Sequence, residues 1–198
     1  PSTGWTITTG NLGSDNGFTG NNFNPGNWTT GSNALGVSFT TAGTYQMRLV
    51  AANSCGPDTI IKTICVASPP SPTMSISGLS GTNGCAPVTV TATNTSFDTS
   101  TCSAASFAWA VTKVSAVCTP DLANDYSYTN HTDSISDTAS IIFNNQGTYT
   151  LALNATNVCG TYSSNQTVNV SNPPQVSIAA PAAICIGQAV TPTSNSSA

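Results

Sequence analysis

The only histidine of this 198-residue chain, His131, is the one side chain whose ordinary pKa would let it act as a base near neutral pH. It lies in the stretch NDYSYTNHTDSISD, with Asp133 and Asp137 close by. A nucleophilic triad needs a base that activates a serine, threonine or cysteine, and two carboxylates could serve as acid and base. Carboxylates in a polar, loop-like stretch are more often solvated turn residues. We therefore predict no catalytic residue and no enzyme activity.

Metal and cofactor sites find little support in the sequence. A zinc site needs clustered cysteine and histidine, but the chain has no CxxC motif and a single histidine. It also has no calcium loop of the DxDxDG type and no phosphate-binding glycine loop before a helix. We predict no metal ion and no cofactor.

Charged residues make up only 5% of the chain, and the net charge is -4. The strong cations are Arg48, Lys62 and Lys113, and glutamate does not occur. Phosphate binding needs clustered basic residues, so nucleic acid is excluded as a partner and an anionic membrane surface is disfavoured. No run of about 18 apolar residues occurs, so we expect no insertion into a membrane.

The elements that would position any site are strands. Serine, threonine and asparagine supply roughly two-fifths of the chain, and this composition favours strands and turns over helices. Apolar residues alternate in short runs bounded by Gly, Pro or Asn at 45–50, 88–92, 149–153 and 168–170. The sequence therefore predicts an all-β fold.

One segment of the sequence occurs twice. GTYQMRLVAANSCG begins at Gly43, and GTYTLALNATNVCG begins 104 residues later, at Gly147. At the same offset Trp5 matches Trp109, and the Pro-Pro pair at 69–70 matches the pair at 173–174. A period of this length is the size of one small domain.

The repeat divides the chain into three parts. Residues 1–70 are predicted to form a repeat that lacks its N-terminal strands, 71–172 a complete repeat, and 173–198 the beginning of a third, where QVSI at Gln175 echoes TMSI at Thr73. The first copy lacks about a third of a unit of roughly 100 residues. Either the chain is a window from a longer tandem array, or it is a subunit whose missing strands come from a neighbour.

Four of the seven cysteines follow the repeat. Cys159 has its counterpart in Cys55, and Cys85 has an approximate counterpart in Cys185. Pairing Cys85 with Cys159 is the economical prediction, and it would close a loop of about 75 residues, worth on the order of 4 kcal/mol. Cys55 and Cys185 are then expected to bond residues before Pro1 and after Ala198.

The other three cysteines have no such counterparts. Cys102 and Cys118 are predicted to pair with each other. Cys65 stays unassigned: a bond to Cys55 would require an awkward separation along a hairpin, and the alternative is a buried free thiol. Disulfides indicate export from the cell, so we predict an extracellular protein.

The pattern FxxxGTYxxxLxxxNxCG, from Phe39 to Gly56 and again from Phe143 to Gly160, resembles the last strands of PKD and PKD-like domains. This resemblance implies tandem immunoglobulin-like β-sandwich domains in which Trp5 and Trp109 pack the core. The family's WDFGDG turn is absent, since AVTK follows Trp109. The cysteine-bearing version resembles repeats of very large surface proteins of the Bacteroidota, including gliding adhesins exported by the type IX secretion system.

Tyr45 and Tyr149, the tyrosines of the two GTY motifs, suit a corner position, with a buried ring and a hydroxyl that bonds the backbone. Gly147 suits a turn.

Two kinds of surface site are candidates. Phe18, Phe23 and Trp28, in a Gly/Asn-rich stretch, could stack on sugars, or they could pin that loop to the sandwich. Thr59, Ser134 and Thr138 follow aspartates in a pattern that resembles O-glycosylation sites of Bacteroidota, an aspartate, a hydroxyl residue and an aliphatic residue.

We predict a non-enzymatic structural segment of an extracellular cell-surface adhesin or filament, a rigid stalk with a candidate adhesive surface and a candidate role in gliding motility. Its Pro-Pro linkers would favour extended backbone and hold successive domains apart. The expected partners are neighbouring repeats, surface polysaccharide, and the secretion or motility machinery. The alternatives are a spacer or carbohydrate-binding module of a secreted hydrolase, and a strand-exchanging filament subunit.

Overall fold

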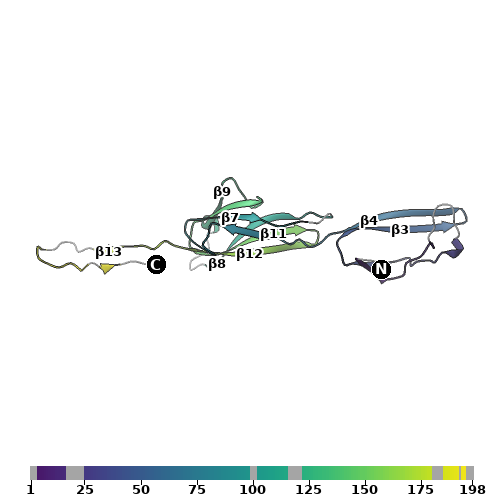
Figure 1. Cartoon of the computed structure of the whole chain (residues 1–198), viewed down its shortest axis with the longest axis horizontal. Coiled ribbons are helices and arrows are strands. Elements are labelled where there is room, and N and C mark those ends of the chain that lie inside the picture. Colours follow the sequence, from purple (N-terminus) through teal and green to yellow (C-terminus); the bar gives the residue numbers. More distant parts are fainter. Residues whose placement is uncertain are drawn as a thin grey trace. The chain divides into compact units, whose positions relative to one another are not determined.

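The computed structural model describes residues 4–16, 25–98, 102–115, 122–179, 185–191 and 193–194. The fold is all-β, as predicted, with its strands in several sheets (Figure 1). The chain divides into two compact units. The first consists of Pro1–Pro70, Asp98–Ala105 and Thr156–Gly160, and the second of Ser71–Phe97, Ser106–Ala155 and Thr161–Ala198. The division of the sequence into three repeats stays a prediction.

Four strands form two antiparallel pairs in the described part of the first unit. β1 (Trp5–Thr9) pairs with β2 (Gly36–Phe39), with Trp5 opposite Phe39. β3 (Gly43–Asn53) and β4 (Gly56–Val66) form a long hairpin with Gly43 opposite Val66. The 3-10 helix η1 (Pro25–Asn27) lies between β1 and β2 in the sequence.

The second unit is a β-sandwich of two four-stranded sheets. One sheet has the order β5-β7-β10-β9, and the other has the order β6-β12-β11-β8. The strands of the first are β5 (Met74–Ser77), β7 (Val88–Asn94), β10 (Thr138–Phe143) and β9 (Tyr126–Thr129). The strands of the second are β6 (Asn83–Cys85), β12 (Gly160–Ser171), β11 (Gly147–Asn157) and β8 (Ser106–Ser115).

Three short elements complete the description. The one-turn helix α1 (Leu122–Asp125) precedes β9, where the sequence predicted no helix. β13 (Ile178–Ala179) pairs with β14 (Thr193–Ser194) near the C-terminal end of the chain.

The core of the sandwich follows the predicted alternation. Tyr149, Leu151, Leu153 and Ala155 on β11 are fully buried, because every second residue of a strand points to the same face. Tyr149, Leu151 and Leu153 cluster with apolar residues of the opposite sheet, which include Val90 and Ala92 of β7 and Ile141 and Phe143 of β10. Burying this surface is the main source of stability in such a fold.

Trp109 on β8 packs in this core, as expected. It is buried, and its indole Nε1 donates a hydrogen bond of 2.8 Å to the Ser136 carbonyl. A buried indole N–H needs such an acceptor. Trp5, its counterpart in the first unit, is only half-buried.

The hairpins of the two units have strands that begin at equivalent positions, and they share their turn. β11 and β12 begin 104 residues after β3 and β4. In both turns an asparagine oxygen accepts a hydrogen bond of 2.8 Å from a cysteine backbone N–H, Asn53 from Cys55 and Asn157 from Cys159.

Each hairpin also carries a tyrosine corner. The Tyr149 hydroxyl donates to the Asn145 carbonyl at 2.8 Å, and the Tyr45 hydroxyl donates to the Thr41 carbonyl at 2.7 Å. The predicted bond of the hydroxyl to the backbone is confirmed for both tyrosines. The predicted burial is confirmed for Tyr149, whereas Tyr45 is only half-buried.

The other strands of the two units do not match. In the second unit β8 and β10 belong to different sheets, and β10 lies between β7 and β9. Their counterparts at the repeat offset, β1 and β2, pair with each other. In the described part of residues 1–70 no strand corresponds to β5, β6 or β7. Every buried core residue of the described chain belongs to the second unit.

The predicted bond between Cys102 and Cys118 is wrong. Cys102 is bonded instead to Cys65, with 5.4 Å between their Cα atoms. The loop 98–105 groups with the hairpin of the first unit, where the Cys102 sulfur lies 3.8 Å from the Gly43 carbonyl oxygen. The register of β3 and β4 places Cys65 opposite Thr44, next to that carbonyl. Cys118 lies outside the described residues.

The predicted bond between Cys85 and Cys159 is also wrong, since both cysteines are free and exposed. Cys85 lies opposite Ser171 at one end of β12, whereas Cys159 directly precedes Gly160 at the other end. At about 3.3 Å per strand residue, the 12-residue strand separates them by more than roughly 30 Å, far beyond the reach of a disulfide.

Candidate functional site

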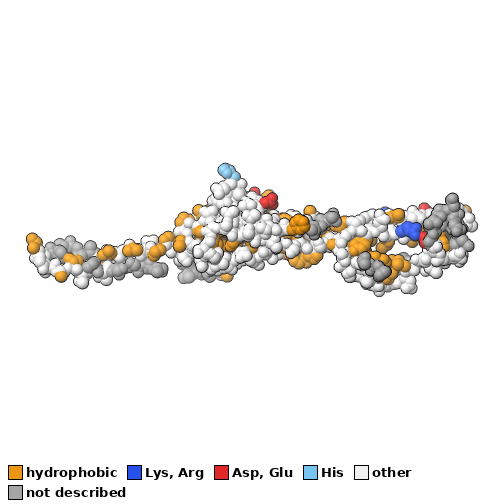
Figure 2. Space-filling model, in the orientation of Figure 1, with side chains coloured by type: hydrophobic (Ala, Val, Ile, Leu, Met, Phe, Trp, Pro, Cys, Tyr) orange, Lys and Arg blue, Asp and Glu red, His pale blue; other side chains and the backbone are white. Residues whose placement is uncertain are grey.

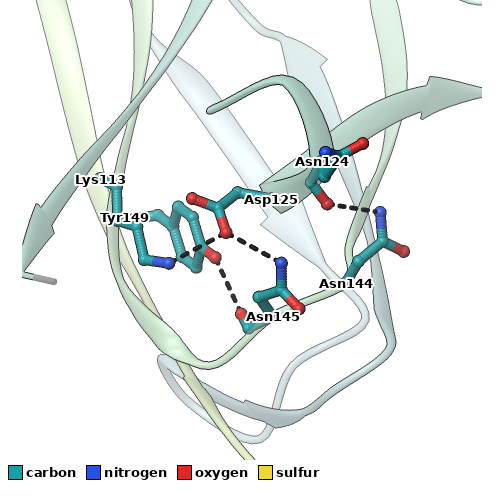
Figure 3. Close-up of polar contacts among 6 residues, drawn as sticks. All are labelled: Lys113, Asn124, Asp125, Asn144, Asn145 and Tyr149. Atoms are coloured by element: carbon teal, nitrogen blue, oxygen red, sulfur yellow. Dashed lines mark hydrogen bonds and ion pairs between the residues drawn. The ribbon is translucent and has the colours of Figure 1, made fainter. Parts of the chain in front are cut away.

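The one enclosed charge cluster in the described part of the chain lies at one end of the sandwich. Lys113 on β8 and Asp125 at the end of α1 form an ion pair with 3.0 Å between Nζ and Oδ1, and their side chains are 10% and 3% exposed (Figure 3). Asn145, in the turn between β10 and β11, donates its amide to the same Oδ1 at 3.0 Å. The cluster therefore connects three segments that are far apart in the sequence.

The two charges stabilise each other against burial. The hydrogen bond to Asp125 raises the pKa of Lys113 above its ordinary value, although burial opposes this shift. Burial acts to raise the pKa of Asp125, but the hydrogen bonds from Lys113 and Asn145 and the charge of Lys113 outweigh it and lower that pKa. Both groups are therefore held in their charged forms.

The neighbouring backbone leaves room for the lysine. A Cβ atom on Gly147 would lie 2.6 Å from Cε of Lys113, so this position accepts only glycine without a shift of the lysine. The Tyr149 ring lies below the ammonium group, with 5.5 Å from Nζ to its centroid. Burial raises the pKa of the Tyr149 hydroxyl, and the charge of Asp125 adds to the effect.

This arrangement suits a structural lock better than catalysis. The ammonium and carboxylate neutralise each other, and the ring, the amide and the glycine enclose them. The cluster pins α1 and the β10–β11 turn to the edge strand β8. Sequence analysis missed it, but a signal was present, since Phe107, Trp109, Val111 and Lys113 alternate toward one face of β8.

A second group of contacts holds the residues just before the first Pro-Pro linker, and all of these contacts lie in the first unit. The Asn157 amide donates to the Ser68 carbonyl at 2.8 Å, and the Cys159 sulfur lies 3.5 Å from the Ala67 carbonyl oxygen. The Cys65–Cys102 disulfide fixes the loop 98–105 to the end of β4 just before this linker. We call the disulfide and these two contacts the linker anchor.

The residues that were considered as acid or base and not predicted to be catalytic, His131, Asp133 and Asp137, lie in the turn between β9 and β10. His131 is exposed and has a positive φ of 60°. Asp133 accepts hydrogen bonds from the Ile135 backbone N–H at 3.0 Å and the Ser136 hydroxyl at 2.9 Å. These bonds lower the pKa of Asp133, the Ile135 bond most. The Asp133 carboxylate thus stabilises the turn in which it lies. Asp137 is exposed at the end of this turn.

The candidate glycan loop falls only partly within the described residues. Phe18 and Phe23 lie outside them, and Trp28 follows η1 with its side chain half-buried. Of the candidate O-glycosylation sites, Thr59 on β4 and Thr138 at the start of β10 are exposed, and Ser134 is half-buried. These roles stay predictions.

Within the described residues no three His, Cys, Asp or Glu side chains are grouped as a metal site would require. No helix of this part of the chain has the length and apolar character needed to span a membrane. No protein-family model matches the chain, and neither does any curated protein.

Proposed function

We propose that this chain is a non-enzymatic structural segment of an extracellular cell-surface adhesin or filament, built from PKD-like, immunoglobulin-like repeats. The observation that supports the proposal best is the linker anchor. Within the first unit, a disulfide and an asparagine hold the residues that precede the Pro-Pro pair. Anchored backbone of this kind suits a stalk, whose mechanism is reach and stiffness.

The other features agree with this function. The enclosed Lys113–Asp125 pair connects segments of the sandwich, and the histidine and its neighbouring aspartates lie in a local turn. A role in gliding motility and export by the type IX system follow from the sequence resemblance alone.

The test combines location with stiffness. Antibodies against the chain should label intact cells of the source organism, and protease added to those cells should remove the label. Small-angle scattering of the purified chain should show a broader distribution of interatomic distances for Cys102→Ser combined with Asn157→Ala than for wild type. The matched control is Cys185→Ser, which removes a free, exposed thiol. Labelling only after the cells are broken, or identical scattering from all three proteins, would contradict the proposal.

A further inference from the structure

A free thiol lies close to the disulfide of the linker anchor. Cys159 is exposed and bonded to no other cysteine, and its sulfur lies 3.5 Å from the carbonyl oxygen of Ala67. Ala67 follows Cys65 by two residues, which is about 7 Å of extended backbone. The thiol therefore lies near the β4 half of the Cys65–Cys102 bond.

The turn that carries this thiol also contacts the loop that carries the other half of the bond. The Val158 backbone N–H donates to the Ser103 hydroxyl at 3.4 Å, and these two residues directly adjoin Cys159 and Cys102. Consecutive Cα atoms are about 3.8 Å apart, so Cys159 and Cys102 are separated by a distance on the order of 10 Å. A disulfide accepts Cα–Cα distances up to about 7 Å, so a closure of a few ångströms would join them.

The disulfide is the reactant that the molecule itself supplies to this thiol. Within the described residues no three metal-ligating side chains are grouped, so a metal ion is not the partner of Cys159 there. Figure 2 shows few charged side chains on the face that it draws, and charged residues make up 5% of the chain, so a charged partner is weakly attracted. Thiol–disulfide exchange needs neither a metal, nor a charged partner, nor an added oxidant.

The surroundings of the bond indicate which sulfur leaves. Cys65 lies on β4 opposite Thr44, and its sulfur is 3.6 Å from the Thr44 hydroxyl oxygen. This hydroxyl can donate to a Cys65 thiolate, and hydrogen bonds to a charged acceptor are the stronger ones. Cys102 lies in the loop before β8 and can follow Cys159 more easily than a residue of the paired strand could. Attack on Cys102 with release of Cys65 is the favoured direction.

We propose that the linker anchor exists as two disulfide isomers that interconvert by thiol–disulfide exchange. The Cys159 thiolate attacks the sulfur of Cys102, so that the Cys102–Cys159 bond forms as the Cys65–Cys102 bond breaks. Cys65 leaves as a thiolate and takes a proton from solvent, which replaces the proton that Cys159 gave up. One disulfide and one thiol are present before and after the step, so there is no net oxidation or reduction.

The second isomer loosens the linker anchor. The end of β4 is then no longer bonded to the loop 98–105, and the Cys159 sulfur has turned from Ala67 to its new partner. Of the contacts that define the anchor, only the hydrogen bond from Asn157 to the Ser68 carbonyl remains. The inference rests on the proposed structural function and adds a regulation to it, since the stiffness of the segment before the first Pro-Pro pair then depends on thiol chemistry.

Tryptic peptides distinguish the two isomers. Trypsin cleaves after the three strong cations of the chain, Arg48, Lys62 and Lys113. Cys65 and Cys102 therefore share the peptide 63–113, whereas Cys159 lies in the peptide 114–198. The purified full chain is incubated at a series of pH values, its free thiols are blocked with N-ethylmaleimide, and the unreduced digest is analysed by mass spectrometry. The first isomer leaves the two peptides separate, and the second links them and leaves Cys65 labelled.

Wild type should form the linked peptides, with an initial rate roughly 100-fold higher at pH 7 than at pH 5, because the thiolate is the attacking species. The rate should not depend on protein concentration, because the step is intramolecular. Cys159→Ser should abolish the link. The matched control Cys85→Ser, which removes another free and exposed thiol, should keep it. Thr44→Val should slow the step several-fold, because it removes the hydroxyl beside the leaving sulfur.

Three results would overturn the inference. They are a wild type whose peptides stay separate after prolonged incubation at pH 9, a link that persists in Cys159→Ser, and a rate that rises with protein concentration. Circular dichroism checks that each variant is folded, and Cys159→Ala replaces Cys159→Ser if the latter is not. Exchange is measured on purified protein, so its failure is distinguishable from a failure of the surface-labelling test.

Discussion

Cys65 at the end of β4 is bonded to Cys102, 37 residues further along the chain and in the loop that leads to β8. The bond fixes the segment before the first Pro-Pro pair to the loop 98–105, and Asn157 holds the Ser68 carbonyl beside it. The linker is thus anchored both covalently and by hydrogen bonds.

Cys102→Ser should destabilise the first unit by roughly 4 kcal/mol, the loop-closure entropy of a loop of this length. Unfolding in guanidinium chloride, followed by tryptophan fluorescence, measures the change, and peptide mapping without reductant identifies the bond. Cys185→Ser should leave the transition unchanged because its thiol is free and exposed. A bond between Cys102 and Cys118 in the peptide map would refute the assignment.

Removal of one partner of the Lys113–Asp125 pair should be more harmful than removal of both. Asp125→Leu leaves a buried ammonium group without a counter-charge and should cost about 3–5 kcal/mol, whereas Lys113→Met with Asp125→Leu should cost much less. Urea unfolding of the two single variants and the double variant gives the coupling free energy. Additive effects would show that the pair does not act as a unit.

The same pair predicts how the stability of the second unit depends on pH. The pKa of Asp125 is lower in the folded than in the unfolded chain, so its contribution is complete above the unfolded pKa, near about 4, and is lost as the pH falls through the folded pKa. The pKa of Lys113 is raised, so its contribution is complete below about pH 10 and is lost as the pH rises through the folded pKa.

Urea midpoints between pH 2 and 7 should therefore fall more steeply for wild type than for Lys113→Met with Asp125→Leu. Asp133, whose pKa is also lowered, contributes to the acid loss in both proteins and cancels in the comparison. Parallel curves would mean that the pair carries no pH-dependent stability.

Leu49 and Leu153 occupy equivalent positions of the two hairpins, so the same Leu→Ala substitution compares an exposed with a buried site. Leu153→Ala should cost about 2–5 kcal/mol because its side chain is fully buried. Leu49→Ala, at 66% exposure, should change the stability of the monomer by less than about 1 kcal/mol. Thermal unfolding at low protein concentration, where copies do not associate, measures both. Equal losses would show that Leu49 is covered within its own chain.

Glycan binding by wild type and by Trp28→Ala distinguishes the proposed stalk function from a carbohydrate-binding module. The proposed function predicts that the chain does not bind a panel of soluble polysaccharides in affinity electrophoresis, and that the variant behaves like wild type. Retardation of wild type by one glycan, with loss of the effect in Trp28→Ala and not in Trp5→Phe, would instead favour the carbohydrate-binding alternative.

Local pattern was enough to predict strands within β3, β7 and β11, the end of β12, and the buried face of β11. Tyr149, Leu151 and Leu153 alternate with the smaller residues Thr150 and Ala152, and alternation alone fixes which side chains share a face. The tyrosine corner was likewise predictable, because the hydroxyl bonds a carbonyl only four residues away. Contacts of this range depend on the local chain and little else.

Contacts between distant residues were decided by the tertiary structure. Cys102 is bonded to Cys65 and not to Cys118 as predicted. This bond depends on which loop lies close to β4, and the sequence repeat carries no information about the position of that loop. Lys113 and Asp125 form their ion pair because the fold brings the end of α1 close to β8. Leu49 and Leu153 show the limit most clearly, since equivalent residues in equivalent hairpins end at 66% and 0% exposure. The sequence by itself determined which face of each hairpin is apolar, but burial of that face requires a second sheet, and only the three-dimensional arrangement decides whether one is present.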